Sequence, residues 1–125
     1  MRRFGILLLA PVMLLCGMAG VPAHAHAHAF LDRAEPAVGS AVRASPATVR
    51  LRFTESIEPA FSTIRVLDSG GRRVDKGDRR VSGVDAKQMT VSLPPLPAGV
   101  YKVVWRVVSV DTHVTEGDFT FTVTP

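Results

Sequence analysis

The stretch YKVVWRV, residues 101–107, places a large apolar side chain at every second position and polar or smaller residues between them. A second run of the same kind, FTFTV, occupies residues 119–123. A period of two with β-branched and aromatic residues predicts strands that bury one face. The same alternation recurs in three earlier segments: residues 49–54, 63–67 and 88–93.

Segments rich in Gly, Pro, Ser and acidic residues separate these runs and predict turns; they are residues 36–40, 69–71, 94–99 and 116–118. No window of ten or more residues after position 27 has the spacing of an amphipathic helix. About seven short antiparallel strands at this spacing predict an all-β fold, a β-sandwich of two packed sheets. The alternating faces can bury each other, so the core needs no disulfide.

The first 27 residues have the composition of a secretory signal peptide. A basic start, Arg2-Arg3, precedes an apolar stretch at residues 4–19 and small residues at 21–27. The apolar stretch is shorter than the roughly 20 residues that span a bilayer. The residues after the arginine pair fit the twin-arginine pattern poorly, which favours the general secretory route. We therefore expect a soluble mature protein in the periplasm or another extracytoplasmic space.

The site of cleavage decides which residue begins the mature protein. Cleavage after Ala27 makes His28 the first residue of a single domain, residues 28–125. Cleavage after Ala23 or Ala25 would instead leave His24 or His26 in a flexible histidine tract.

Cysteine content and charge exclude several classes of function. The one cysteine, Cys16, lies within the predicted signal peptide, so thiol catalysis, zinc sites with cysteine ligands and blue-copper electron transfer lack their sulfur ligand. Loss of Arg2 and Arg3 lowers the formal charge from +4 to +2. The remaining basic residues are spread over several segments with acids between them, which argues against a nucleic-acid surface.

Candidate metal ligands lie near both ends of the predicted domain. A free N-terminal histidine offers its α-amine and its imidazole Nδ1, and Asp111 and His113 add a carboxylate and a third nitrogen. In an extended strand, residues 111 and 113 would point the same way. A bare Asp-x-His pair is common in solvated loops. Its coincidence with His28 favours a site, and a planar set of nitrogen and oxygen donors suits Cu(II).

These residues stand in motifs that cover essentially the whole predicted domain: His28-Ala29-Phe30-Leu31 followed by Pro36 and Gly39, Leu51-Arg52-Phe53-Thr54-Glu55, Phe61-Ser62, Ala98-Gly99-Val100-Tyr101 with Trp105-Arg106, and Ser109-Val110-Asp111-Thr112-His113 with Gly117. With this pattern the chain resembles the CopC family of periplasmic copper-resistance proteins. The resemblance implies a cupredoxin-like Greek-key sandwich and one Cu(II) site formed by His28, Asp111 and His113. It also implies that Glu55 supports the site from outside the ligand set.

The chain departs from this family pattern at two places. Some members carry a second, Cu(I)-binding site in a methionine-rich loop with a histidine, but residues 68–87 contain neither residue. Met89, the one methionine after position 27, falls on the alternating face of a strand and is expected in the core. Val114 stands where a proline often follows the histidine. We therefore expect one Cu(II) per chain and no Cu(I) site.

Three functions are compatible with these residues. The first is a monomeric, non-enzymatic copper chaperone or buffer that delivers copper to a membrane importer of the CopD type or limits free copper. The second is a copper oxygenase with an N-terminal histidine brace, which needs an open coordination position that Asp111 would fill. The third is a structural sandwich domain without metal.

Overall fold

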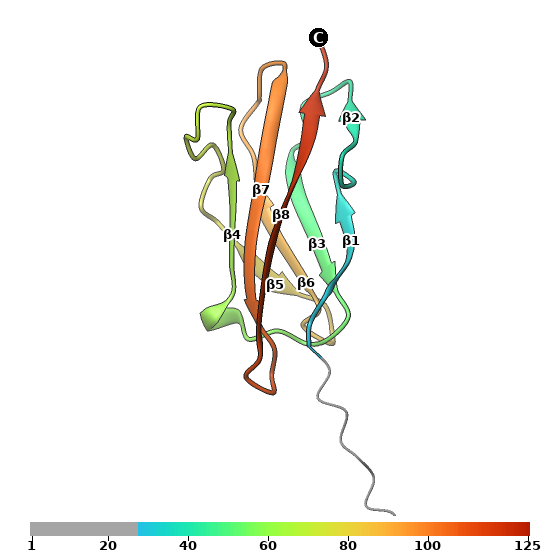
Figure 1. The fold of residues 1–125 in the computed structure, drawn as a ribbon, viewed down its shortest axis with the longest axis vertical. Helices are drawn as coiled ribbons and strands as arrows, with labels where there is room; N and C mark the ends of the chain where they lie inside the picture. The colour runs from blue at the N-terminus through green and yellow to red at the C-terminus, as the bar shows by residue number, and fades with distance from the viewer. Residues whose placement is uncertain (1–27) are drawn as a thin grey trace, which may run out of the picture.

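The computed structural model describes residues 28–125, which form two packed four-stranded sheets (Figure 1). One sheet has the order β1-β3-β6-β5: β1 is Leu31–Glu35, β3 is Thr48–Phe53, β6 is Gln88–Ser92 and β5 is Arg80–Ser82. The other has the order β2-β8-β7-β4: β2 is Ala41–Val42, β8 is Val114–Val123, β7 is Gly99–Val108 and β4 is Thr63–Leu67. A short 3-10 turn, η1, spans Pro59–Phe61. The predicted all-β sandwich is confirmed.

The core lies between the two sheets and is built from the alternating positions of the sequence. In β3, Val49, Leu51 and Phe53 are buried, while the residues between them are exposed. Phe53 meets the ring of Trp105 on β7 edge to face, with ring centroids 5.3 Å apart. Met89 is 0% exposed, which confirms its predicted place in the core. Within residues 28–125, no helix is long and apolar enough to cross a membrane.

The longest element is the antiparallel hairpin of β7 and β8, which pair from Gly99 opposite Val123 to Val108 opposite Val114. The turn predicted at residues 116–118 is wrong, because these residues lie inside β8. Gly117 faces Trp105 across the ladder, and a Cβ on it would lie 2.8 Å from Trp105 Cζ2. Glycine is required at this position because the indole ring of Trp105 packs directly on the backbone. The sequence alone does not distinguish such a glycine from one in a turn.

The structure has eight strands where about seven were predicted, and β1, β2 and β5 fall outside the alternating segments recognised in the sequence. β2 has two residues and β5 has three, too few for an alternating pattern to be recognised. β2 runs parallel to β8, whereas all strands were predicted to be antiparallel. The predicted signal peptide, with His24 and His26, lies outside the described residues.

The two ends of the sandwich carry different parts of the chain. The described chain begins at the end where the β7–β8 turn and η1 lie, and its C-terminus lies at the opposite end (Figure 1). Loops fasten the first end together: Val110 N donates to Ser56 O, and Glu58 N donates to Val108 O. The predicted metal ligands His28, Asp111 and His113 therefore share one end of the molecule.

Replacing Gly117 by Ala is expected to lower the free energy of unfolding by about 1–3 kcal/mol, because Trp105 must leave its packed position. Gly99→Ala is the matched control, since a Cβ there would lie 3.8 Å from Tyr101, an ordinary contact. Urea denaturation of both variants measures the effect. Equal stability of the two variants would contradict the packing role of Gly117.

Candidate metal site

His28 is held in place by the end of β3. Thr54 N donates to Phe30 O at 2.9 Å, and Phe30 N donates to Thr54 Oγ1 at 3.0 Å. The hydroxyl of Thr54 in turn donates to the carbonyl oxygen of His28 at 3.3 Å. One threonine thus binds the backbone on both sides of residue 29 and fixes where the histidine side chain leaves the chain.

The second sheet holds the same segment from its other side. Thr115 Oγ1 on β8 donates to the carbonyl oxygen of Ala29 at 2.6 Å, and Ala29 is fully buried. Residues 28–30 therefore bridge β3 of one sheet and β8 of the other. This bridge brings His28 beside the turn that connects β7 to β8.

That turn, residues 109–113, is closed by backbone hydrogen bonds. Ser109 N donates to His113 O at 2.9 Å, and Thr112 N donates to Ser109 O at 2.8 Å. Thr112 has a φ of 71°, in the left-handed region. Residues 111–113 are therefore not extended, because closing a ten-pair hairpin requires the chain to reverse here.

The tight turn nevertheless brings the two side chains together. His113 Nδ1 lies 3.2 Å from Asp111 Oδ2, while the other carboxylate oxygen of Asp111 accepts a hydrogen bond from the hydroxyl of Ser109. His113 N donates to Ser109 Oγ at 3.2 Å. The bond from Ser109 and then the contact with His113 hold the pKa of Asp111 below its usual value, so this side chain is a carboxylate at neutral pH.

The imidazole of His28 completes the cluster. Its ring centroid lies 4.4 Å from that of His113, with the rings tilted by 40°, and 5.9 Å from the ring of Phe30. Phe30 is itself 59% exposed, so an exposed apolar ring lies beside His28. Two imidazoles and one carboxylate from opposite ends of the predicted domain thus lie at one place.

The side chains of His28, Asp111 and His113 are neighbours, but their donor atoms are not arranged around one common point. In residues 28–125, no three His, Asp or Glu side chains are arranged closely enough to hold a metal ion as they stand. Asp111 is turned toward Ser109 and His113, and His28 is here joined through its nitrogen to the preceding residue. Glu55 follows Thr54 in the loop after β3 and is half-buried; its supporting role stays a prediction.

Comparison with known proteins gives a family match. The profile of the CopC domain matches residues 31–124, which include every strand of both sheets. The chain belongs to the CopC family. Copper-binding resistance proteins make up this family, so a copper-related function and the cupredoxin-like β-sandwich are established by membership.

Two solved structures are similar over most of the described residues. The CopC protein of Methylosinus trichosporium OB3b is 42% identical with a TM-score of 0.74, and covers 78% of this chain and 95% of its own. PcoC of Escherichia coli, a methionine-rich copper resistance protein, is 37% identical with a TM-score of 0.66, covering 78% of this chain and 100% of its own.

Two sequence relatives differ in how much of their own length the chain spans. Copper resistance protein C of Escherichia coli is 38% identical over 112 residues, 83% of this chain and 87% of the relative. Copper transport protein CutJ of Bacillus subtilis is 33% identical over 113 residues, 90% of this chain. The chain spans only 21% of CutJ, so CutJ has a large further part.

Sequence reasoning missed the residues that position the cluster. Thr54, Ser109 and Thr115 carry no signal of their own in the sequence, because threonines and serines are common on strands and in turns. Thr54 and Ser109 stand in the family motifs, beside Glu55 and Asp111, and that adjacency is the one available hint. The two threonines bind partners that lie 24 and 86 positions away in the sequence. Only the folded structure shows that these residues meet.

Thr54→Val should release the segment that carries His28, because valine keeps the shape but neither donates to His28 O nor accepts from Phe30 N. Backbone amide exchange of Phe30 is expected to rise, and copper affinity to fall about 10–100-fold, as for loss of a group that orients a ligand. Thr120→Val, on the exposed face of β8, is the control. Unchanged amide exchange in Thr54→Val would refute the positioning role.

Proposed function

We propose that the protein binds one Cu(II) ion at its N-terminal end, through His28, Asp111 and His113, after removal of residues 1–27. The observation that carries the proposal is the meeting of the two imidazoles, 4.4 Å between centroids, beside a carboxylate 3.2 Å from one of them. In the sequence, His28 lies far from the other two residues, and only the bridge of residues 28–30 across both sheets brings them together.

The spacing of the donors supports binding to a single ion. Two ligand atoms about 2.0–2.1 Å from one metal ion, at a right angle, are separated by roughly 2.9 Å. His113 Nδ1 and Asp111 Oδ2 are 3.2 Å apart, so a small shift lets both bind in neighbouring positions. Because the pKa of Asp111 is lowered, its carboxylate is already charged and the metal ion has no proton to displace from it.

Processing of the chain would supply the remaining donor. Cleavage after Ala27 frees the α-amine of His28, which lies on the same residue as its imidazole and forms a chelate with it. Thr54 and Thr115 hold the two carbonyl groups of residues 28 and 29, so the amine and the ring start from a fixed backbone. Anchoring lowers the entropy cost of bringing this chelate to the ion.

The kind of donor favours Cu(II) over Cu(I). Imidazole, amine and carboxylate suit Cu(II), whereas Cu(I) prefers thiolates and thioethers. PcoC is described as methionine-rich, but in residues 28–125 of this chain the sole methionine, Met89, is fully buried in the core. Met89 therefore cannot present its sulfur to an ion without unfolding β6. We infer a single Cu(II) site without a separate Cu(I) site.

We infer that the protein carries or buffers copper in the periplasm and is not an enzyme. Asp111, beside His113, would fill the position that a histidine-brace oxygenase leaves open for oxygen. CutJ is a copper transport protein, and a domain similar to this chain makes up about a fifth of it. A membrane importer of the CopD type is the partner we propose, with this protein acting as a monomer that delivers the ion.

Asp111→Ala and His113→Ala are each expected to weaken Cu(II) binding at least roughly 100-fold, about 2.7 kcal/mol, in a competition titration with correctly processed protein. Asp118→Ala is the matched control, since Asp118 is an exposed carboxylate of β8 outside the cluster. The fold should persist in all three, because none of these side chains lies in the core. Binding of two Cu(II) ions of similar affinity, or equal affinities in the Asp111 and Asp118 variants, would refute the proposed site.

A further inference from the structure

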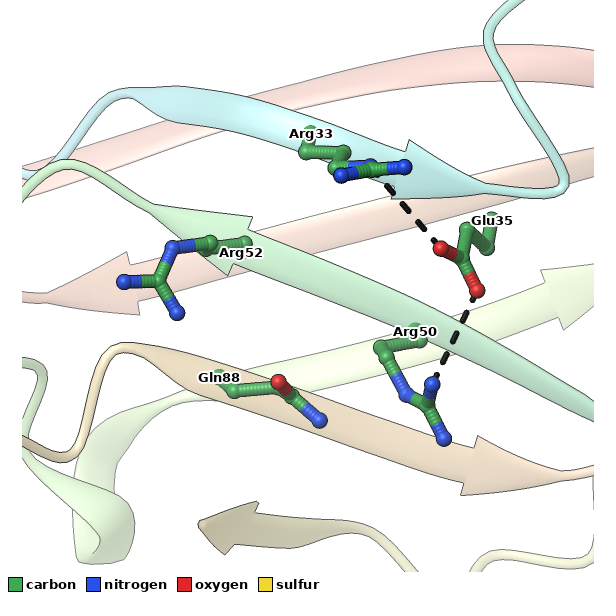
Figure 2. A pocket seen from close by; sticks show the side chains of 5 residues that line it. All are labelled: Arg33, Glu35, Arg50, Arg52 and Gln88. Atoms are coloured by element: carbon green, nitrogen blue, oxygen red, sulfur yellow. Dashed lines mark ion pairs between the residues drawn. The ribbon is translucent and has the colours of Figure 1, made fainter. Parts of the chain in front are cut away.

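The outer face of the sheet β1-β3-β6-β5 carries a cluster of arginines that the copper site does not use. In the strand register, Arg33 of β1 lies opposite Arg52 of β3, and Glu35 lies opposite Arg50. On the other side of β3, Gln88 of β6 lies opposite Arg52. Figure 2 shows these five side chains on the same face of the three strands. We call this set the arginine groove.

The arginine groove encloses a hollow of about 350 Å³, lined by these five residues. This volume is at the lower end of the range for small-ligand sites. The side chains of Arg50 and Arg52 are 49% and 47% exposed, so each remains open to solvent over about half of its surface. Five donor groups per guanidinium and the amide of Gln88 can therefore point into one small volume.

The charges within the groove are poorly balanced. Glu35 is the one acid among the lining residues and is shared by two arginines, 3.8 Å from Arg33 and 3.7 Å from Arg50 (Figure 2). Arg52 has its nearest acid, Asp85, at 3.7 Å. All three distances exceed those of a charge-assisted hydrogen bond, about 2.7–2.9 Å. The donors of the groove are thus only loosely engaged by the protein's own carboxylates.

The strand pairing makes this imbalance unfavourable. Like charges directly opposite each other on neighbouring strands destabilise a sheet, and Arg33 opposite Arg52 is such a pair. The pairing of β1 with β3 is irregular between Leu31 and Arg33, and bulges of this kind redirect side chains. A bound negative group between the two guanidinium groups would remove the repulsion that the fold leaves in place.

We propose that the arginine groove binds a small, multiply charged oxyanion, such as phosphate or a di- or tricarboxylate. Arginine presents its donors as a planar fork that matches carboxylate and phosphate oxygens. The hollow of about 350 Å³ suits one compact anion, and two acids lie near it, Glu35 within the lining and Asp85 beside Arg52. They would repel an extended anionic surface such as a bilayer, so a free anion is the occupant that the charges favour.

Glu35 has a specific part in this proposal, because its carboxylate occupies two of the guanidinium groups that the anion would use. If Glu35 only stabilised the sheet, neutralising it would not strengthen anion binding. If its carboxylate competes with the anion for the guanidinium groups, neutralising it makes anion binding tighter. Glu35→Gln should therefore bind the anion several-fold more tightly than the unchanged protein.

The test is titration of the metal-free protein, residues 28–125 with the native N-terminus, with inorganic phosphate and separately with citrate. Low ionic strength is needed, because salt screens an exposed charge pair. Calorimetry and amide NMR shifts should show saturable 1:1 binding at β1, β3 and β6. Arg52→Gln should weaken it at least about 10-fold and Arg52→Lys less, since lysine keeps the charge but not the fork. Arg65→Gln, on the other sheet, is the control.

The proposal is overturned by no saturable binding of either anion, by equal weakening in Arg52→Gln and Arg65→Gln, or by unchanged or weaker binding in Glu35→Gln. Vesicles containing phosphatidylglycerol form the second arm, and binding to them without binding of free phosphate or citrate would also overturn it. The amide spectrum of each variant shows whether it is folded. Arg52→Lys retains the charge pattern of the sheet, so it keeps the test decisive if Arg52→Gln unfolds.

Discussion

The register of the β7–β8 ladder is the constraint on which the rest of the structure depends. Ten consecutive pairs, from Gly99 opposite Val123 to Val108 opposite Val114, fix which side chains enter the core and where the chain must reverse. A slip of one of the two strands by one residue would turn its buried face outward. It would also remove Gly117 from under Trp105, where no other side chain fits without displacing the ring.

The same register places the candidate copper ligands. Because the ladder ends at Val108 and Val114, the reversal falls on residues 109–113, and Ser109 closes it through its backbone and hydroxyl. Asp111 and His113 meet as a result of this closure. Thr115, one residue into β8, then holds Ala29 and so brings His28 to the turn. The strand pairing, the turn and the N-terminal segment therefore form one connected arrangement.

Much of the fold could be predicted from the sequence, because alternation in β3, β4, β6, β7 and β8 reports directly which faces are buried. The short strands β2 and β5 could not be predicted, since two or three residues show no period. The sequence predicts Gly117 as a turn residue, because a sequence does not show whether glycine serves flexibility or space. The contact of Trp105 with Gly117 supplies that information.

The candidate site was predictable in its residue types and less so in its geometry. Nitrogen and oxygen donors at His28, Asp111 and His113 could be read from the chain, and the family motifs supplied the connection between them. The left-handed Thr112 and the anchoring hydroxyls of Thr54 and Thr115 depend on the closed hairpin and on pairing between sheets. The arginine groove was hidden for the same reason, since residues from three strands gather only in the folded sheet.

The central claim is that the free N-terminus of His28 is part of the copper site, and one comparison of affinities tests it most directly. Cu(II) affinity is measured for protein that begins at His28 and for protein with one methionine before it, which turns the amine into an amide. The account predicts binding at least roughly 100-fold weaker, about 2.7 kcal/mol, in the extended protein. It also predicts the same thermal unfolding midpoint for both without metal. Equal Cu(II) affinities would contradict the account and show that the imidazoles and Asp111 suffice.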